Sequence, residues 1–282
     1  KAGITTLCVP PDTDPVIDNP AVAELIGQHA VRAGHARVVT LGALTQGLQG
    51  EQLAEMAALK SAGCVGVSNA LRSISNTRIL QRAYDYAATH DLTVFIKPMD
   101  SFLAHGGCVH EGVVSARLGL PCIPEAAETI AVASHLILIE QTGVRAHFCQ
   151  LSTARAAQMI GRAQFDGLPI SADVAAHQLH LTEMDISEFN SQCHVLPPLR
   201  SQRDRAGLRE AVVKGTISAI CSDHQPHEED AKLAPFCATE SGISSLETLL
   251  PLALRLVDEE NMPLAQLIAR LTQLPAKILG IK

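Results

Sequence analysis

One short segment carries side chains well suited to chemistry. The run Ser222-Asp223-His224-Gln225-Pro226-His227 places a carboxylate and two imidazoles close together. Such a group can ligate a metal ion or transfer protons. The alternative is structural: Asp223 caps the loop, and the two histidines hydrogen-bond backbone carbonyl groups. The segment alone leaves both interpretations open.

Polar side chains also follow several other short apolar runs. In a barrel of strands and helices, reactive side chains come from the carboxyl ends of the strands. We interpret His177 and His180 as hydrogen-bonded structural residues, because no carboxylate motif accompanies them. The further candidates at predicted strand ends are Asp12, Ser68, Asn69, Lys97 and Gln150.

A scaffold of alternating strands and helices must position these residues, and the sequence predicts one. Short β-branched runs alternate with longer helical patterns, as in βα units around a parallel sheet. Two of the predicted helices cover residues 76–89 and 152–164. The seven predicted strands are Thr5–Val9, Arg37–Leu41, Val65–Val67, Thr93–Ile96, Arg145–Cys149, Ile170–Val174 and Thr216–Cys221.

The predicted fold class is α/β, with an eight-stranded barrel as its architecture. Eight strands close a barrel whose interior is filled by side chains, so we expect one more strand before Lys1. A doubly wound open sheet is the alternative, but its phosphate-binding glycine motifs are absent. We therefore predict a single barrel domain over residues 1–282 that is incomplete at both ends.

Composition excludes several classes of partner. With 22 basic and 29 acidic residues, the chain offers no basic stripe for nucleic acid. Its apolar stretches fall short of the roughly 20 residues that span a bilayer, and its start does not resemble a signal peptide. The eight cysteines form no C-x-x-C pair. We therefore expect them to be reduced and the protein to be cytoplasmic.

Several segments resemble those of bacterial dihydroorotases of the amidohydrolase superfamily, in the same order along the chain. They are residues 42–48 (GALTQGL), 111–121 (EGVVSARLGLP), 222–227 (SDHQPH) and 275–280 (PAKILG). The resemblance implies a TIM-like barrel of the metal-dependent hydrolase type. It also implies that the first strand and a small flanking β domain lie outside this chain.

The resemblance also identifies positions that bind zinc in the active family. Asn69 lies in Ser68-Asn69-Ala70-Leu71, where the family has Ser-Asp-Asp-Gly. Lys97 and Gln150 each replace a histidine, and Asp223 is the one ligand we recognise as retained. The family's first-strand H-x-H motif does not occur in this chain. Asn69, Lys97, Gln150 and Asp223 are therefore degenerate ligand positions.

The substrate side differs as well. Asp12 stands where the family has a substrate-facing asparagine, and Leu196 replaces the asparagine of Asn-Pro-Pro-Leu-Arg. A carboxylate at the position of Asp12 would repel an anionic substrate. We interpret Asp12, Leu196 and His227 as vestiges of a substrate pocket.

These substitutions predict the loss of metal and of catalysis. Zinc needs three or four lone-pair donors, whereas the ammonium of Lys97 has no lone pair. Without a metal, no hydroxide is generated near neutral pH to attack a cyclic amide. We therefore expect no cofactor and no catalytic residue, with Asp223 vestigial. We also expect Lys97 and Asp223 to form an ion pair across the barrel mouth.

The resemblance implies a non-catalytic dihydroorotase-like subunit acting in pyrimidine biosynthesis. Its partner would be the catalytic chain of aspartate carbamoyltransferase, in a homo- or hetero-oligomer. One alternative is an active zinc-dependent dihydroorotase with an unusual metal site, in which the missing strand supplies H-x-H. Another is a small-molecule sensor whose pocket uses Asp12, Lys97 and His227.

Overall fold

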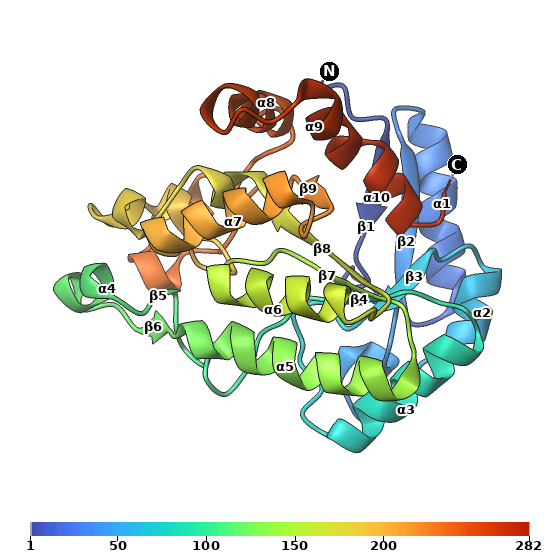
Figure 1. Ribbon diagram of the computed structural model, residues 1–282. Helices are drawn as coiled ribbons and strands as arrows, with labels where there is room; N and C mark the ends of the chain where they lie inside the picture. The colour runs from blue at the N-terminus through green and yellow to red at the C-terminus, as the bar shows by residue number, and fades with distance from the viewer. Residues whose placement is uncertain (1, 282) are drawn as a thin grey trace.

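Seven parallel strands form one curled sheet with helices on its outer side in the computed structural model, which describes residues 2–281 (Figure 1). Every pair of neighbouring strands is parallel, and the order follows the chain. The strands are β1 (Thr6–Val9), β2 (Arg37–Ala43), β3 (Gly66–Ser68), β4 (Val94–Ile96), β7 (Ala146–Phe148), β8 (Ile170–Ala175) and β9 (Ala219–Cys221).

All seven predicted strands are confirmed, each within a few residues of its predicted bounds. The prediction missed a separate pair of two-residue parallel strands, β5 (Val109–His110) and β6 (Cys122–Ile123). Within residues 2–281, β1 and β9 are the two ends of the strand order. The expected eighth strand falls outside the described residues and stays a prediction.

Helices follow most strands. The predicted helices over 76–89 and 152–164 correspond to α3 and α6, whose first turns are capped by the Asn76 and Thr153 side chains. Each cap accepts a hydrogen bond from a backbone N–H that the helix leaves unpaired. The helices are α1 (Pro20–Ala33), α2 (Met56–Ser61), α3 (Thr77–Thr89), α4 (Val113–Leu118), α5 (Glu125–Thr142), α6 (Ala154–Phe165), α7 (Gln202–Lys214), α8 (Leu249–Glu259), α9 (Leu264–Leu271) and α10 (Gln273–Ile278).

The main hydrophobic core lies between the sheet and its helices. Ile96, Phe148 and Val174 on the strands pack in one buried cluster with Tyr84 of α3 and Ile160 of α6. Successive side chains of a strand point to opposite faces of the sheet. In each of these strands, the residues directly before and after such a core position therefore face the concave interior of the curled sheet.

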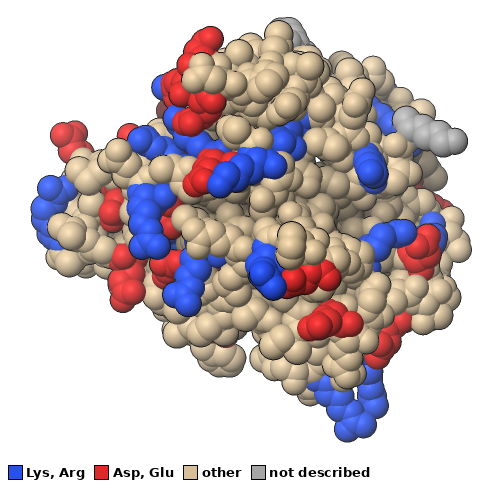
Figure 2. Space-filling view, in the orientation of Figure 1, with Lys and Arg blue, Asp and Glu red and all other residues tan. Residues whose placement is uncertain are grey.

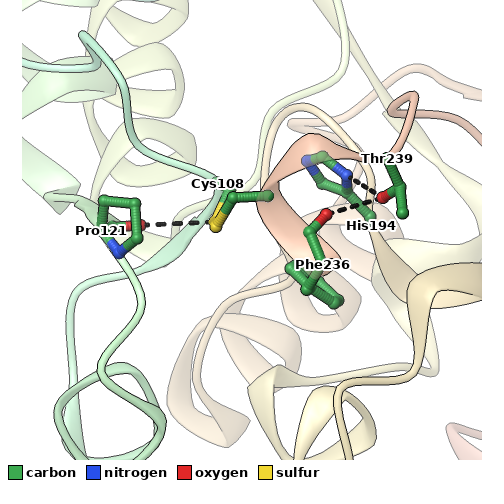
Figure 3. The surroundings of a disulfide bond; sticks show 6 residues. Cys108, Pro121, His194, Phe236 and Thr239 are labelled. Atoms are coloured by element: carbon green, nitrogen blue, oxygen red, sulfur yellow. Dashed lines mark hydrogen bonds between the residues drawn. A yellow bond between two sulfur atoms is a disulfide. The ribbon is translucent and has the colours of Figure 1, made fainter. Parts of the chain in front are cut away.

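The prediction that all eight cysteines are reduced is wrong for two of them. Cys108 and Cys237 form a disulfide with a Cα–Cα distance of 5.5 Å. Figure 3 shows the surroundings of Cys108. Beside it, the Thr239 hydroxyl donates to the Phe236 carbonyl and bonds Nδ1 of His194. The two cysteines are 129 residues apart, so local spacing gave no sign of the pairing. Cysteine usage therefore gives no support for a cytoplasmic location.

The distribution of charged side chains on the surface agrees with the similar numbers of acidic and basic residues in the sequence. Figure 2 shows one face of the molecule on which acidic and basic side chains are interspersed, without a continuous basic stripe. No helix among residues 2–281 has the length and apolar character needed to cross a membrane.

A buried ion pair joins the loop before α7 to α5. Arg200 is 2% exposed and donates to the Ser152 hydroxyl at 3.0 Å and to the Ile123 carbonyl at 2.8 Å. Its guanidinium lies 3.9 Å from the carboxylate of Glu128, which also accepts hydrogen bonds from the backbone N–H groups of Ser152 and Thr153. The buried positive charge of Arg200 and the buried negative charge of Glu128 therefore balance each other.

We predict that Arg200→Ala lowers the free energy of unfolding by about 3–5 kcal/mol, because it leaves the Glu128 carboxylate buried without a counter-charge. Urea unfolding followed by circular dichroism measures the change. The matched control is Arg255→Ala, which removes an exposed ion pair with Glu259 and should cost about 0–1 kcal/mol. Equal losses in the two variants would contradict this account of Arg200.

Candidate functional site

The candidate side chains lie at the carboxyl ends of the strands, as predicted. Asn69 follows β3, Lys97 follows β4, Gln150 follows β7 and Asp223 follows β9. His177 lies in the 3-10 turn Ala176–Leu179, directly after β8. Because the strands are parallel, all of these ends open at one edge of the sheet, which we call the mouth.

Asp223 is held by two amide side chains. Nε2 of Gln150 donates to its Oδ1 at 2.5 Å, and Nε2 of Gln225 donates to the same oxygen at 3.0 Å. Asp223 and Gln150 have φ values of 47° and 56°, in the left-handed region that non-glycine residues seldom adopt. Burial raises the pKa of the Asp223 carboxyl, and the nearby Lys97 ammonium acts in the opposite direction.

The predicted ion pair between Lys97 and Asp223 is wrong as a direct contact. No ion pair within 4.0 Å joins the two side chains. Lys97 Nζ instead donates to the backbone carbonyl of Leu196 at 2.8 Å. The hydrogen bond to the Asp223 carboxylate comes from the side-chain amide of Gln150. Lys97 thus influences Asp223 through its field rather than by contact.

The amide of Asn69 is fully used by its neighbours. Its Oδ1 accepts from the Thr45 hydroxyl at 2.7 Å, and its Nδ2 donates to the carbonyls of Arg72 at 2.8 Å and Leu48 at 3.3 Å. The side chain thereby fixes the loops that follow β2 and β3. Asn69 and Lys97 line one small cavity together.

The structure assigns different roles to the two histidines after β8. His180 is hydrogen-bonded to the Leu252 carbonyl at 2.8 Å and to Arg209 at 3.0 Å, which confirms its structural interpretation. The same interpretation is wrong for His177, which is 2% exposed and whose ring nitrogens both lack a partner among residues 2–281. Its position directly after a strand was the one sequence signal that pointed to a site.

The side chains of the Asp223 segment follow the structural interpretation in part. Nδ1 of His224 accepts from the backbone N–H of Ser245 at 3.0 Å, and Nε2 of His227 bonds the Ser241 carbonyl at 2.9 Å. These bonds fasten the loop to residues 241–246. Asp12 is exposed after β1 and Leu196 contributes its carbonyl to Lys97, so their assignment as pocket vestiges stays a prediction.

The donor set at the mouth does not fit a binuclear zinc site. Lys97 offers no lone pair, and Gln150 turns an N–H donor toward Asp223. Both ends of the Asn69 amide are already hydrogen-bonded. Oε1 of Gln150 is unpaired but is only a neutral amide oxygen. Among the described strand-end residues named above, the carboxylate of Asp223 and the imidazole of His177 are the zinc-type donors left, whereas zinc requires three or four.

A curled parallel sheet with helices outside and polar residues at its strand ends defines the class of α/β barrels. Solved structures share this fold. They include an L-hydantoinase (dihydropyrimidinase) from Arthrobacter aurescens, with a TM-score of 0.85 at 21% identity over 99% of this chain and 64% of that one. They also include a dihydroorotase from Saccharomyces cerevisiae, with a TM-score of 0.79 at 16% identity over 100% of this chain and 78% of that one.

Sequence comparison places the chain more narrowly. A family model described as dihydro-orotase-like matches residues 1–156. The chain is 56% identical to a dihydroorotase-like protein of Pseudomonas putida, covering 99% of this chain and 66% of that protein. It is 40% identical to a dihydroorotase of Syntrophobacter fumaroxidans, covering 99% of this chain and 64% of that protein. The chain therefore belongs to the dihydroorotase-like family and spans about two thirds of the length of these relatives.

We predict that Lys97→Met raises the pKa of the His177 imidazole. Burial first, and the Lys97 charge second, hold that pKa at about 4. Removing the ammonium should move it upward, while burial keeps it below 6.5. Titration of the imidazole resonances by NMR measures the shift. Lys60→Met, a charge removal at the exposed end of α2, serves as the control, and equal pKa values in all three proteins would refute the coupling.

His177 also predicts a pH dependence of stability. Its pKa is about 4 in the folded chain against 6.5 as the reference value, so the unfolded state binds more protons between these values. The free energy of unfolding contributed by His177 is therefore lost as the pH falls from about 6.5 toward 4. Urea unfolding across this pH range should show a smaller decrease in the free energy of unfolding for His177→Gln than for the wild type. A parallel loss in both proteins would contradict the prediction.

Proposed function

We propose that this chain is a catalytically inactive dihydroorotase-like subunit that supports pyrimidine biosynthesis as the structural partner of the aspartate carbamoyltransferase catalytic chain. The observation that carries the inactive half is the arrangement at the mouth. There the Lys97 ammonium and the Gln150 amide occupy ligand positions and make hydrogen bonds within the protein. The partner half and a cytoplasmic location rest on the family resemblance.

The chemistry of ring opening explains why these contacts matter. Hydrolysis of a cyclic amide near pH 7 uses a metal ion to lower the pKa of bound water from about 16 to about 7. A fixed ammonium adds positive charge where a cation would otherwise bind. The amide of Gln150 faces Asp223 with its N–H group, so Asp223 already has a donor on Oδ1. Neither replacement activates water.

The second candidate function is an active, zinc-dependent dihydroorotase with an unusual site. Two observations favour it: Asp223 is present, and the imidazole of His177 is buried without a hydrogen-bond partner in the described part of the chain. Relatives at 40% identity carry the name dihydroorotase. Two donors are fewer than zinc requires, so this function depends on ligands from outside residues 2–281.

We predict no interconversion of carbamoyl aspartate and dihydroorotate by the purified full-length protein, alone or with added zinc. The same preparation should co-elute with the aspartate carbamoyltransferase catalytic chain in gel filtration. An active member of the family provides the positive control for the assay.

The variant Asp223→Asn separates the two functions. For the structural subunit it should leave co-elution with the carbamoyltransferase unchanged. Turnover by the wild type that disappears in Asp223→Asn would establish the enzyme instead. Separate elution of the two chains, together with no turnover, would refute the subunit proposal.

A further inference from the structure

A second group of potential ligands lies deeper in the barrel, in the strands or directly at their ends. His147 in β7, Cys149 directly after β7 and Asp173 in β8 place their ligand atoms within 4.8 Å of one another. Cys221, the last residue of β9, has its Sγ at 3.3 Å from Oδ1 of Asp173. Three neighbouring strands thus direct one imidazole, two thiols and one carboxylate to the same part of the barrel interior.

We propose that His147, Cys149, Asp173 and Cys221 bind one thiophilic divalent cation of the Zn²⁺ class, at a site separate from the family's ligand positions. Mixed nitrogen, sulfur and carboxylate donors are the ligands that zinc takes in proteins, and four of them complete a tetrahedral shell. Thiolates favour such a cation over Mg²⁺ or Ca²⁺.

The ligand atoms of His147, Cys149 and Asp173 lie within 4.8 Å of one another, and Cys221 reaches them through its 3.3 Å contact to Oδ1 of Asp173, so side-chain rotations are needed to close one shell. Bonds of about 2.0–2.3 Å in a tetrahedral shell leave ligand atoms roughly 3.3–3.8 Å apart. The cation would take the place of two existing contacts of Asp173, the 2.9 Å hydrogen bond to Nε2 of His147 and the 3.3 Å contact to Cys221. Both contacts already hold the donors near each other.

Ser171 supplies the outer support that a ligating histidine needs. Its hydroxyl lies 2.7 Å from Nδ1 of His147. A hydroxyl both donates and accepts, so it can pair with Nδ1 in either tautomer of the ring. It can therefore hold Nδ1–H when Nε2 offers its lone pair to a cation.

The charges of the cluster also favour a cation over a reactive thiol. Burial and the Asp173 carboxylate raise the pKa of Cys149 and of Cys221 well above the ordinary value, so neither is an activated nucleophile. Two thiolates and one carboxylate around a dication leave one negative charge. The Lys97 ammonium, which lowers the pKa of Cys149, supplies the opposite charge nearby.

The expectation that the chain takes no cofactor came from the mouth positions, and this proposal departs from it. None of the four interior residues occupies a position that the family resemblance identifies as a ligand. A cation here would join β7, β8 and β9 and act as a structural element.

Cobalt provides the test, because Co²⁺ occupies zinc sites and its thiolate bonds give a charge-transfer absorption. The reduced, metal-free full chain should bind one equivalent of Co²⁺ with this absorption. Cys149→Ser and Cys221→Ser should each weaken binding by more than about 100-fold, since losing a ligand costs more than losing its outer support. Cys122→Ser, at a free half-buried cysteine on β6, should bind like the wild type.

Two further measurements keep the test decisive. Zn²⁺ should raise the melting temperature of the wild type but not that of Cys149→Ser, while circular dichroism confirms that each variant folds. Asp223→Asn should retain the cobalt absorption. No thiolate absorption in the wild type would refute the site, as would a signal that survives both cysteine variants and disappears in Asp223→Asn. Because no readout involves turnover, the result is independent of the proposed function.

Discussion

The buried carboxylate of Asp173 is the constraint on which the site depends. Its Oδ1 accepts from the backbone N–H of Gln150 at 2.7 Å, and its Oδ2 bonds His147 at 2.9 Å. Its own carbonyl accepts from the backbone N–H of Leu151 at 3.1 Å. These bonds support the left-handed backbone of Gln150, and that turn lets the side-chain amide reach Asp223. A residue inside β8 therefore shapes the mouth.

Two carboxylates close together in a low-dielectric interior need a nearby positive charge. Asp173 raises the pKa of Asp223, and Lys97 lowers it. Lys97 meets this need without touching either carboxylate, because its Nζ is held by the Leu196 carbonyl. A fixed ammonium nearby lowers the energy of the Asp223 anion, as a bound cation would. Lys97 is thus compatible with a stable fold at this position.

The sequence predicted the scaffold well because of how parallel strands are buried. Strands covered on both faces form short, nearly continuous apolar runs, and all seven were recognisable. β5 and β6, with two residues each, are too short to carry a pattern. Positions at strand ends were equally predictable, since the chain order fixes the edge at which they open.

Which side chains bond to one another, within the site and in the disulfide, was not predictable in the same way. The choice of Gln150 over Lys97 as the neighbour of Asp223 depends on the backbone turn that Asp173 stabilises. The disulfide of Cys108 joins residues 129 apart, which no local motif reveals. The thiols of Cys149 and Cys221 were likewise interpreted as buried hydrophobic groups, because the residues they meet are distant in the sequence. The polar residues at the mouth and the His147, Cys149 and Asp173 donors inside the barrel can vary independently, because they occupy different positions along the same strands.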